Sequence, residues 1–182
     1  IKMMNSQQLQ PEMESRVDEV AEMLGVNALV AKALLQNFMW SKERLLESFM
    51  SDTEAALKKA GVSMRCNRME VSKEGGGPKE CPICFDDFDS LVSMPCGHEF
   101  CKNCWRDFCD NAIDEGPSVI RKTCPHAGCP ELVTEAEVEA AIGSDSALFN
   151  RYKSFQLRSF VDSNTLTRWC PGPGCERVAF AQ

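Results

Sequence analysis

The sequence predicts a mainly α-helical chain that also contains a small zinc-stabilised α+β module. Apolar residues recur at helical spacing before residue 60 and again after residue 134. Between these stretches lie eight potential metal ligands, seven cysteines and one histidine, from Cys81 to Cys129. A module of about 50 residues rarely buries enough apolar surface to fold alone. We therefore expect bound metal to supply its missing stability.

The first 60 residues are expected to form a three-helix bundle over residues 13–60, after a polar and flexible N-terminus at residues 1–12. Met13, Val17, Val20 and Leu24 recur at helical spacing, and Gly25 suits the end of that helix. Apolar residues between positions 30 and 38 mark a second helix, and those between 45 and 49 mark a third. A capping-box pattern at positions 51–54 precedes a further short helical run that ends at residue 61.

One linker is expected on each side of the cysteine-rich module at residues 80–133. Residues 61–79 contain the run Gly75-Gly76-Gly77-Pro78, which cannot hold regular structure cheaply. Cys66 stands alone in this segment and is interpreted as incidental rather than as a reactive thiol. Residues 134–167 are expected to form a helical linker, which opens with a capping-box pattern at Thr134 and Glu137.

Charge and composition exclude several classes of function. Lys plus Arg number 20 and Asp plus Glu number 27, a net charge of −7 that disfavours phosphate binding and therefore nucleic acid. No apolar run approaches the ~20 residues that span a bilayer, and no signal peptide is visible, so we expect no membrane association. Ten of the 11 cysteines lie in short pairs or near pairs, which favours zinc over disulfides. Reduced thiolates on zinc indicate the cytoplasm, or the nucleus.

The cysteine-rich module has enough ligands for two zinc ions, because zinc takes thiolate and imidazole ligands in tetrahedral fours. The eight ligands are Cys81, Cys84, Cys96, His98, Cys101, Cys104, Cys124 and Cys129. They leave no open coordination position, so the zinc is expected to be structural rather than hydrolytic. His126 is expected to be a bystander, Cys109 a buried thiol and Trp105 a core residue.

This ligand order, with the single histidine fourth, resembles a RING finger. The resemblance implies a cross-brace, in which Cys81, Cys84, Cys101 and Cys104 bind one zinc and Cys96, His98, Cys124 and Cys129 bind the other. RING fingers bind ubiquitin-conjugating enzymes through an apolar groove, and the matching residues are Ile83, Phe85, Phe108 and Pro125. Phe85 and Phe108 could instead pack internally. Pro130 stands where many RING fingers place an arginine, and proline has no side-chain donor for the carried ubiquitin.

The N-terminal bundle resembles a ubiquitin-associated (UBA) domain over about residues 13–50. Leu24-Gly25-Val26 matches only part of that family's ubiquitin-contacting loop. Met39 and Trp40 are better candidates for surface contact, although a core position is favoured for Trp40. The resemblance implies ubiquitin as a partner or, as in Ariadne relatives, a ubiquitin-like modifier on cullins.

The C-terminal residues 168–182 contain Trp169-Cys170, and Cys175 completes half of a third zinc site. With the preceding domains, this layout resembles an RBR (RING-between-RING) ubiquitin ligase of the Ariadne branch, truncated at the start of its in-between-RING domain. The resemblance implies a ubiquitin transferase that recruits a charged conjugating enzyme. The catalytic cysteine would lie in a second RING absent from this chain, and the Cys170 and Cys175 thiols would lack a complete metal site. Two alternatives are a zinc-organised interaction module without ubiquitin chemistry and a conventional RING ligase with direct transfer.

Overall fold

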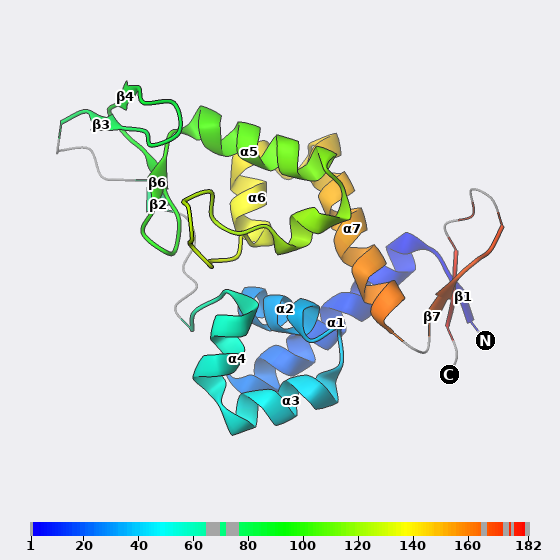
Figure 1. The fold of residues 1–182 in the computed structure, drawn as a ribbon. Helices are drawn as coiled ribbons and strands as arrows, with labels where there is room; N and C mark the ends of the chain where they lie inside the picture. The colour runs from blue at the N-terminus through cyan, green and yellow to red at the C-terminus, as the bar shows by residue number, and fades with distance from the viewer. Residues whose placement is uncertain are drawn as a thin grey trace. The chain divides into compact units, whose positions relative to one another are not determined.

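The structure is a computed structural model that describes residues 2–64, 70–71, 77–164, 167–172, 175 and 177–180 (Figure 1). It divides into two compact units. The first comprises residues 1–64 together with 153–182, and the second comprises residues 65–152. Cys66, which the sequence presented as a lone linker cysteine, lies outside the described residues.

The first unit contains four helices, which are the three of the predicted bundle and the further short helical run that was expected to end at residue 61. They are α1 (Ser6–Leu24), α2 (Ala28–Asn37), α3 (Lys42–Ser51) and α4 (Thr53–Ala60). Gly25 ends α1 with a φ of 65°, a left-handed conformation that glycine adopts without strain. The cap of α4 differs from the expected pattern, because Ser51 is the last residue of α3. Asp52 caps α4 instead, and its carboxylate accepts from the Ala55 backbone N–H at 2.9 Å.

The N-terminus also differs from the flexible segment expected at residues 1–12. Strand β1 spans Lys2–Met4, and α1 begins at Ser6. Asn5 and Gln8 form a reciprocal capping box: Asn5 Oδ1 accepts from Gln8 N at 2.9 Å, and Gln8 Oε1 accepts from Asn5 N at 3.1 Å. Met4 and Leu9 are buried. Two buried apolar side chains among polar ones are too few to give a periodic signal, which is why the sequence did not predict this order.

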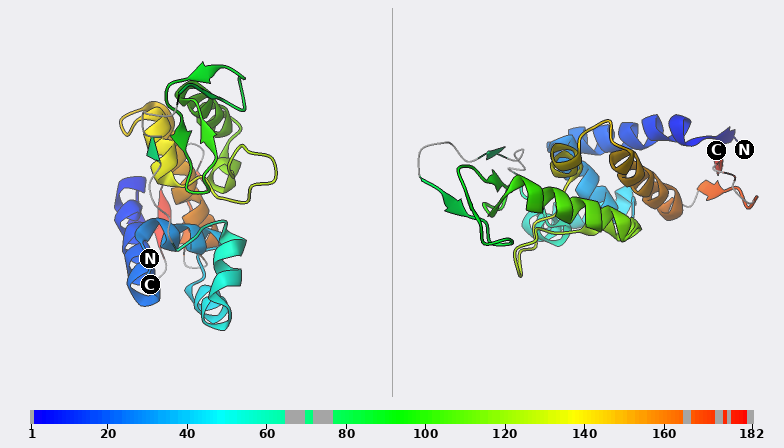
Figure 2. Two further views of the ribbon diagram at one scale, coloured as in Figure 1. Left: turned by 90° about the vertical axis from the view of Figure 1, so that its left-hand side faces the viewer. Right: turned by 90° about the horizontal axis from the view of Figure 1, so that it is seen from above.

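A small antiparallel sheet completes the first unit. Its strands are β1, β7 (Thr167–Trp169) and β8 (Val178–Phe180), in the order β1–β8–β7. Met4 pairs with Val178, and Thr167 pairs with Phe180. The first and last described residues, Lys2 and Phe180, therefore pair with each other in this sheet (Figure 2). The preceding helix α7 (Ala147–Ser163) ends before the expected linker boundary at residue 167, which lies in β7.

The second unit combines short strands with helices, as the predicted α+β module requires. Its strands are β2 (Glu70–Val71), β3 (Lys79–Glu80), β4 (Asp87–Phe88), β5 (Val92–Ser93) and β6 (Glu99–Phe100). Strand β2 comes from the segment predicted to be only a linker, and it pairs with β5 in a β2–β5–β6 sheet. Strands β3 and β4 form a separate pair.

Three helical elements and the start of α7 complete this unit: α5 (Lys102–Asp114), the 3₁₀ helix η1 (Pro117–Arg121) and α6 (Glu135–Ile142). Trp105 lies at the centre of the core, and its indole N–H donates to the Glu137 carbonyl at 3.3 Å. This contact fixes α6 to α5, whose N-cap is Cys101 and whose first turn contains Cys104. Among the described residues, no helix is long and apolar enough to cross a membrane.

Candidate metal centres and binding surface

The structure brings the first predicted quartet together. The Sγ atoms of Cys81, Cys84, Cys101 and Cys104 all lie within 4.8 Å of one another. Cys81 follows β3, whereas Cys101 caps α5 and Cys104 lies in its first turn. The backbone N–H of Cys101 donates to Cys81 Sγ at 3.4 Å, and that of Cys104 donates to Cys101 Sγ at the same distance. The start of α5 therefore supplies both ligands and donors that favour thiolate.

The second quartet forms between the β5–β6 connection and the segment after η1. The ligand atoms of Cys96, His98, Cys124 and Cys129 lie within 4.8 Å of one another. His98 Nδ1 lies 3.2 Å from Cys96 Sγ and 3.6 Å from Cys124 Sγ. Nδ1 is therefore the imidazole atom directed at the thiols. Exposed His126 stacks on the His98 ring, with centroids 3.9 Å apart, and is not a member of the cluster.

The electrostatics of the two clusters match a soft divalent cation. Burial raises the pKa of Cys81, but hydrogen bonds from the backbone amides of Cys101, Cys84 and Ile83 outweigh burial and lower that pKa to about 6. Burial and neighbouring cysteines raise the pKa of Cys104, and burial with Cys96 and Cys129 raises that of Cys124 to about 12. Neither the four thiolates of the first cluster nor the three of the second can share so small a space without a compensating charge. Zinc supplies that charge and prefers this donor set, so the chain has two structural zinc sites.

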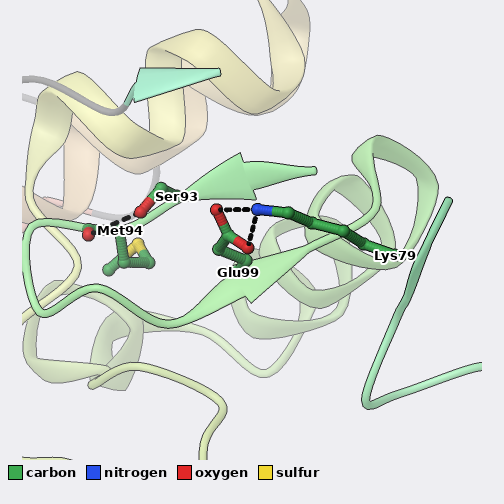
Figure 3. Close-up of polar contacts among 4 residues, drawn as sticks. All are labelled: Lys79, Ser93, Met94 and Glu99. Carbon is green, nitrogen blue, oxygen red and sulfur yellow. Dashed lines mark hydrogen bonds and ion pairs between the residues drawn. The ribbon is translucent and has the colours of Figure 1, made fainter. Parts of the chain in front are cut away.

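A bidentate ion pair, which the sequence did not reveal, connects the two zinc regions (Figure 3). Lys79 Nζ lies 3.1 Å from Glu99 Oε1 and 2.8 Å from Glu99 Oε2. Lys79 lies in β3 just before the first quartet begins, and Glu99 directly follows His98 of the second. In the same view, Ser93 Oγ donates to the Met94 carbonyl at 3.3 Å. Local periodicity in the sequence cannot predict this ion pair, because Lys79 and Glu99 are 20 residues apart.

The four predicted groove residues are all at least partly exposed. Ile83 is 41% exposed and Phe85 is 72% exposed, both in the first zinc loop. Phe85 has a φ of 62°, an unusual left-handed conformation for a bulky residue. Phe108 is half-buried and stacks on Trp105, with centroids 5.5 Å apart. Pro125 is half-buried in the loop of the second quartet.

The remaining candidate residues divide between surface and core. Met39 is 52% exposed, whereas Trp40 is only 3% exposed. Cys109 is buried away from both clusters, and burial raises the pKa of its thiol to about 12. Cys170 and Cys175 lie within hydrogen-bonding reach of each other: bonds from the Gly172 amide and from the Cys175 thiol lower the pKa of the Cys170 thiol.

Comparisons with known proteins agree with this division. Residues 11–51 match the family model for the UBA-like domain of E3 ubiquitin-protein ligase ARIH1. Residues 81–131 match the family model for the C3HC4-type zinc finger, the RING finger. The two matches correspond to the helical bundle of the first unit and to the zinc-binding part of the second.

The relatives that match along most of the chain include ubiquitin ligases. The chain is 33% identical over 171 residues to E3 ubiquitin-protein ligase dbl4 of Schizosaccharomyces pombe, an alignment that covers 92% of this chain and 32% of that protein. It is 30% identical to probable E3 ubiquitin-protein ligase rbrA of Dictyostelium discoideum, over 94% of this chain and 33% of that protein. It is 32% identical to the human ankyrin repeat and IBR domain-containing protein 1, over 88% of this chain and 17% of that protein. The chain thus spans a third or less of the length of these relatives.

Proposed function

We propose that this chain, which carries the UBA-like domain and the first RING finger of an Ariadne-like RBR ubiquitin ligase, is the part of the ligase that recruits a ubiquitin-charged conjugating enzyme. The recruiting surface is the groove formed by Ile83, Phe85, Phe108 and Pro125. The full ligase would then transfer ubiquitin through a catalytic cysteine in a second RING, as a covalent intermediate.

The exposure of Ile83 and Phe85 is the observation that carries this proposal. Both are large apolar side chains in a module with little apolar surface to spare, yet 41% and 72% of their surfaces are exposed. Exposed apolar residues that lie close together in the chain mark interaction sites more often than isolated ones do. Both flank Cys84, so a metal-bound loop would hold them rigidly, and a pre-organised surface loses little entropy on binding.

The chain's own residues account for how the surface is positioned. The Trp105 ring stacks on the Phe108 ring and holds it in position. The Trp105 indole is in turn fixed by its hydrogen bond to the Glu137 carbonyl. Lys79 and Glu99 connect the strand before the first zinc loop to the hairpin of the second. The zinc ions, when bound, supply the cross-links that keep both loops in place.

Pro130 supports a relay through cysteine rather than direct transfer to lysine. It is exposed and directly follows the last ligand, Cys129. It offers no side-chain donor to orient a carried ubiquitin. A conventional RING mechanism therefore lacks the group that it needs at this position.

The bundle is a second candidate binding region, for ubiquitin or a ubiquitin-like modifier on cullins. Its exposed apolar residues include Met23, beside the predicted loop Leu24-Gly25-Val26, as well as Met39 and Met50. We place the protein in the cytoplasm or nucleus, because its many thiolates require a reducing compartment.

The groove is tested by Ile83→Ala against a matched control, Met64→Ala, which removes another apolar side chain that is 53% exposed and lies after α4. Biolayer interferometry would measure the affinity of each variant for a conjugating enzyme that carries ubiquitin through a stable linkage. We expect Ile83→Ala to weaken binding at least about tenfold, because central apolar anchors dominate interfaces. Met64→Ala should leave the affinity unchanged, and both variants should retain two zinc ions. Equal affinity for Ile83→Ala and the parent chain would contradict the groove.

The mode of transfer is tested by the rate of ubiquitin discharge to free lysine. We expect the zinc-loaded chain to bind the charged conjugating enzyme without accelerating this discharge, and Pro130→Arg to introduce some acceleration. Acceleration by the parent chain would support a conventional RING ligase. Absence of any binding by a chain with two zinc ions would favour an interaction module without ubiquitin chemistry.

A further inference from the structure

An aromatic contact joins the bundle to the second half of α7. The proposed recruitment of a conjugating enzyme does not involve this contact. Trp40 packs edge-on against Phe160, with ring centroids 5.0 Å apart, and the Arg16 guanidinium lies 5.4 Å from the centroid of the same ring. Trp40 is 3% exposed and Phe160 is 1% exposed. A helix that follows the RING in sequence is thus held by a domain that precedes it.

The same end of α7 is fixed to the hairpin that carries the third cysteine pair. Asp162, two residues after Phe160, accepts from the Trp169 indole N–H at 2.8 Å. The buried Thr167 hydroxyl lies 2.7 Å from the Val161 carbonyl and 3.0 Å from the Asn164 carbonyl. These bonds attach β7 to the last turn of the helix. Because Cys170 directly follows Trp169, its position depends on that turn.

A second attachment reaches the same hairpin from the N-terminus. Strand β1 adds to the free edge of β8, where buried Met4 pairs with fully buried Val178. Asn5 directly connects β1 to α1 through the capping box. The hairpin is therefore held to the bundle at two separate places, one through α7 and one through β1.

The closed aromatic contact coincides with backbone strain and with buried donors that lack an acceptor. Separation of the two rings would relieve both. Met39 and Trp40, in the turn between α2 and α3, have φ values of 54° and 58°, a conformation that side-chain-bearing residues adopt with strain. Within the described part of the chain, Trp40 Nε1 and Gln36 Nε2 are buried without a hydrogen-bond partner. Opening would let the turn relax and both donors reach water. The closed state thus depends on the burial of the Trp40 and Phe160 rings against each other.

We propose that the turn at Met39 and Trp40 is a releasable latch, which in its closed state fixes α7 and the Cys170 hairpin to the bundle. Opening it frees the end of α7 from Trp40 and leaves the hairpin attached to the bundle through β1 alone. This device couples the bundle to the placement of the third cysteine pair. It does not depend on ubiquitin transfer, so it can fail while the proposed function stands.

The test uses fluorine NMR of the zinc-loaded chain labelled with 5-fluorotryptophan, which gives one signal for each of the three tryptophans, Trp40, Trp105 and Trp169. We expect Phe160→Ala to move the Trp40 and Trp169 signals and to leave the Trp105 signal of the second unit in place. Asp162→Ala should move Trp169 alone. A Trp169 signal unchanged by Phe160→Ala would overturn the coupling.

Hydrogen exchange provides a second measurement that remains informative if one variant is unstable. We expect Phe160→Ala and the milder Phe160→Leu to accelerate amide exchange in residues 153–163 and 178–180 by about tenfold or more. Peptides of residues 81–131 should keep the parent rates. Met50→Ala, which removes an 82% exposed side chain in the last turn of α3, is the matched control and should have little effect. Equal rates in the Phe160 variants and the Met50→Ala control would contradict the latch.

Discussion

At the scale of single residues, Glu137 combines burial with charge. Its side chain is 1% exposed, and one carboxylate oxygen, Oε2, accepts from the Thr134 backbone N–H at 2.8 Å and from the Thr134 hydroxyl. The other, Oε1, is buried without a partner among the described residues. Burial raises the pKa of this carboxyl, although the hydrogen bonds from Thr134 oppose the rise. Glu137 therefore stabilises the start of α6 at an electrostatic cost.

The first prediction concerns Glu137→Gln, which keeps an acceptor for Thr134 and removes the buried charge. Because the folded pKa is raised, the folded state binds more protons, and the contribution of Glu137 to stability falls as pH rises from about 4.5 through the raised pKa. The variant should therefore gain stability relative to the parent over that interval. The free energy of unfolding of both proteins, compared at each pH by urea denaturation, checks this. If the difference in unfolding free energy between the two proteins did not change with pH, the ionisation of Glu137 would not contribute to stability as described.

The residue scale also shows what sequence could reveal. The eight zinc ligands and the exposure of Ile83 could be predicted, because ligand spacing and the geometry of a metal knuckle are local properties of the chain. The Lys79–Glu99 pair and the contact between Trp40 and Phe160 could not, because they join residues that only tertiary folding brings together.

At the scale of elements, the helix ends are fixed by side chains that cap them. Asn27 Oδ1 accepts from Val30 N, and Asp52 Oδ1 accepts from Ala55 N, each at 2.9 Å. The capping pattern in the sequence predicted Ser51 as the cap of α4, whereas the cap is Asp52. Serine and aspartate are both good caps, so two such residues in succession leave the helix start uncertain by one position. Strands of two residues, such as β2 within the predicted linker, leave no periodic pattern at all.

The second prediction is that Asp52→Ala destabilises the bundle by about 1 kcal/mol, because it leaves the Ala55 N–H without its acceptor. Asp52→Asn is the matched control and should lie close to the parent, since asparagine caps helices equally well. Urea denaturation followed by circular dichroism measures both. Equal losses in the two variants would indicate an effect of charge rather than of the cap.

At the scale of the whole molecule, the two units draw their stability from different sources. The bundle has capped helices and a core of buried apolar side chains such as Leu34, Leu35 and Leu45. The RING in the second unit has only short strands and a small core around Trp105, so much of its free energy of folding must come from metal binding. The sequence predicted this contrast from composition, but not that residues 153–182 would group with the bundle.

The third prediction follows from this contrast. A strong chelator should release two tightly held zinc ions and unfold the RING, while the helices of the bundle persist. Circular dichroism, zinc titration and the Trp105 fluorine signal would follow the change. Loss of all helical signal together with zinc would show that the bundle depends on the metal. A third zinc ion held as tightly as the first two would contradict the description of Cys170 and Cys175 as half a site.

The central claim is that the zinc-organised surface around Ile83 recruits a charged conjugating enzyme. Calorimetric titration of a conjugating enzyme, stably linked to ubiquitin, into the zinc-loaded chain tests it most directly. We predict saturable one-to-one binding that Ile83→Ala removes, while Met64→Ala retains it. Absence of heat and of binding in a chain that holds two zinc ions would contradict the account.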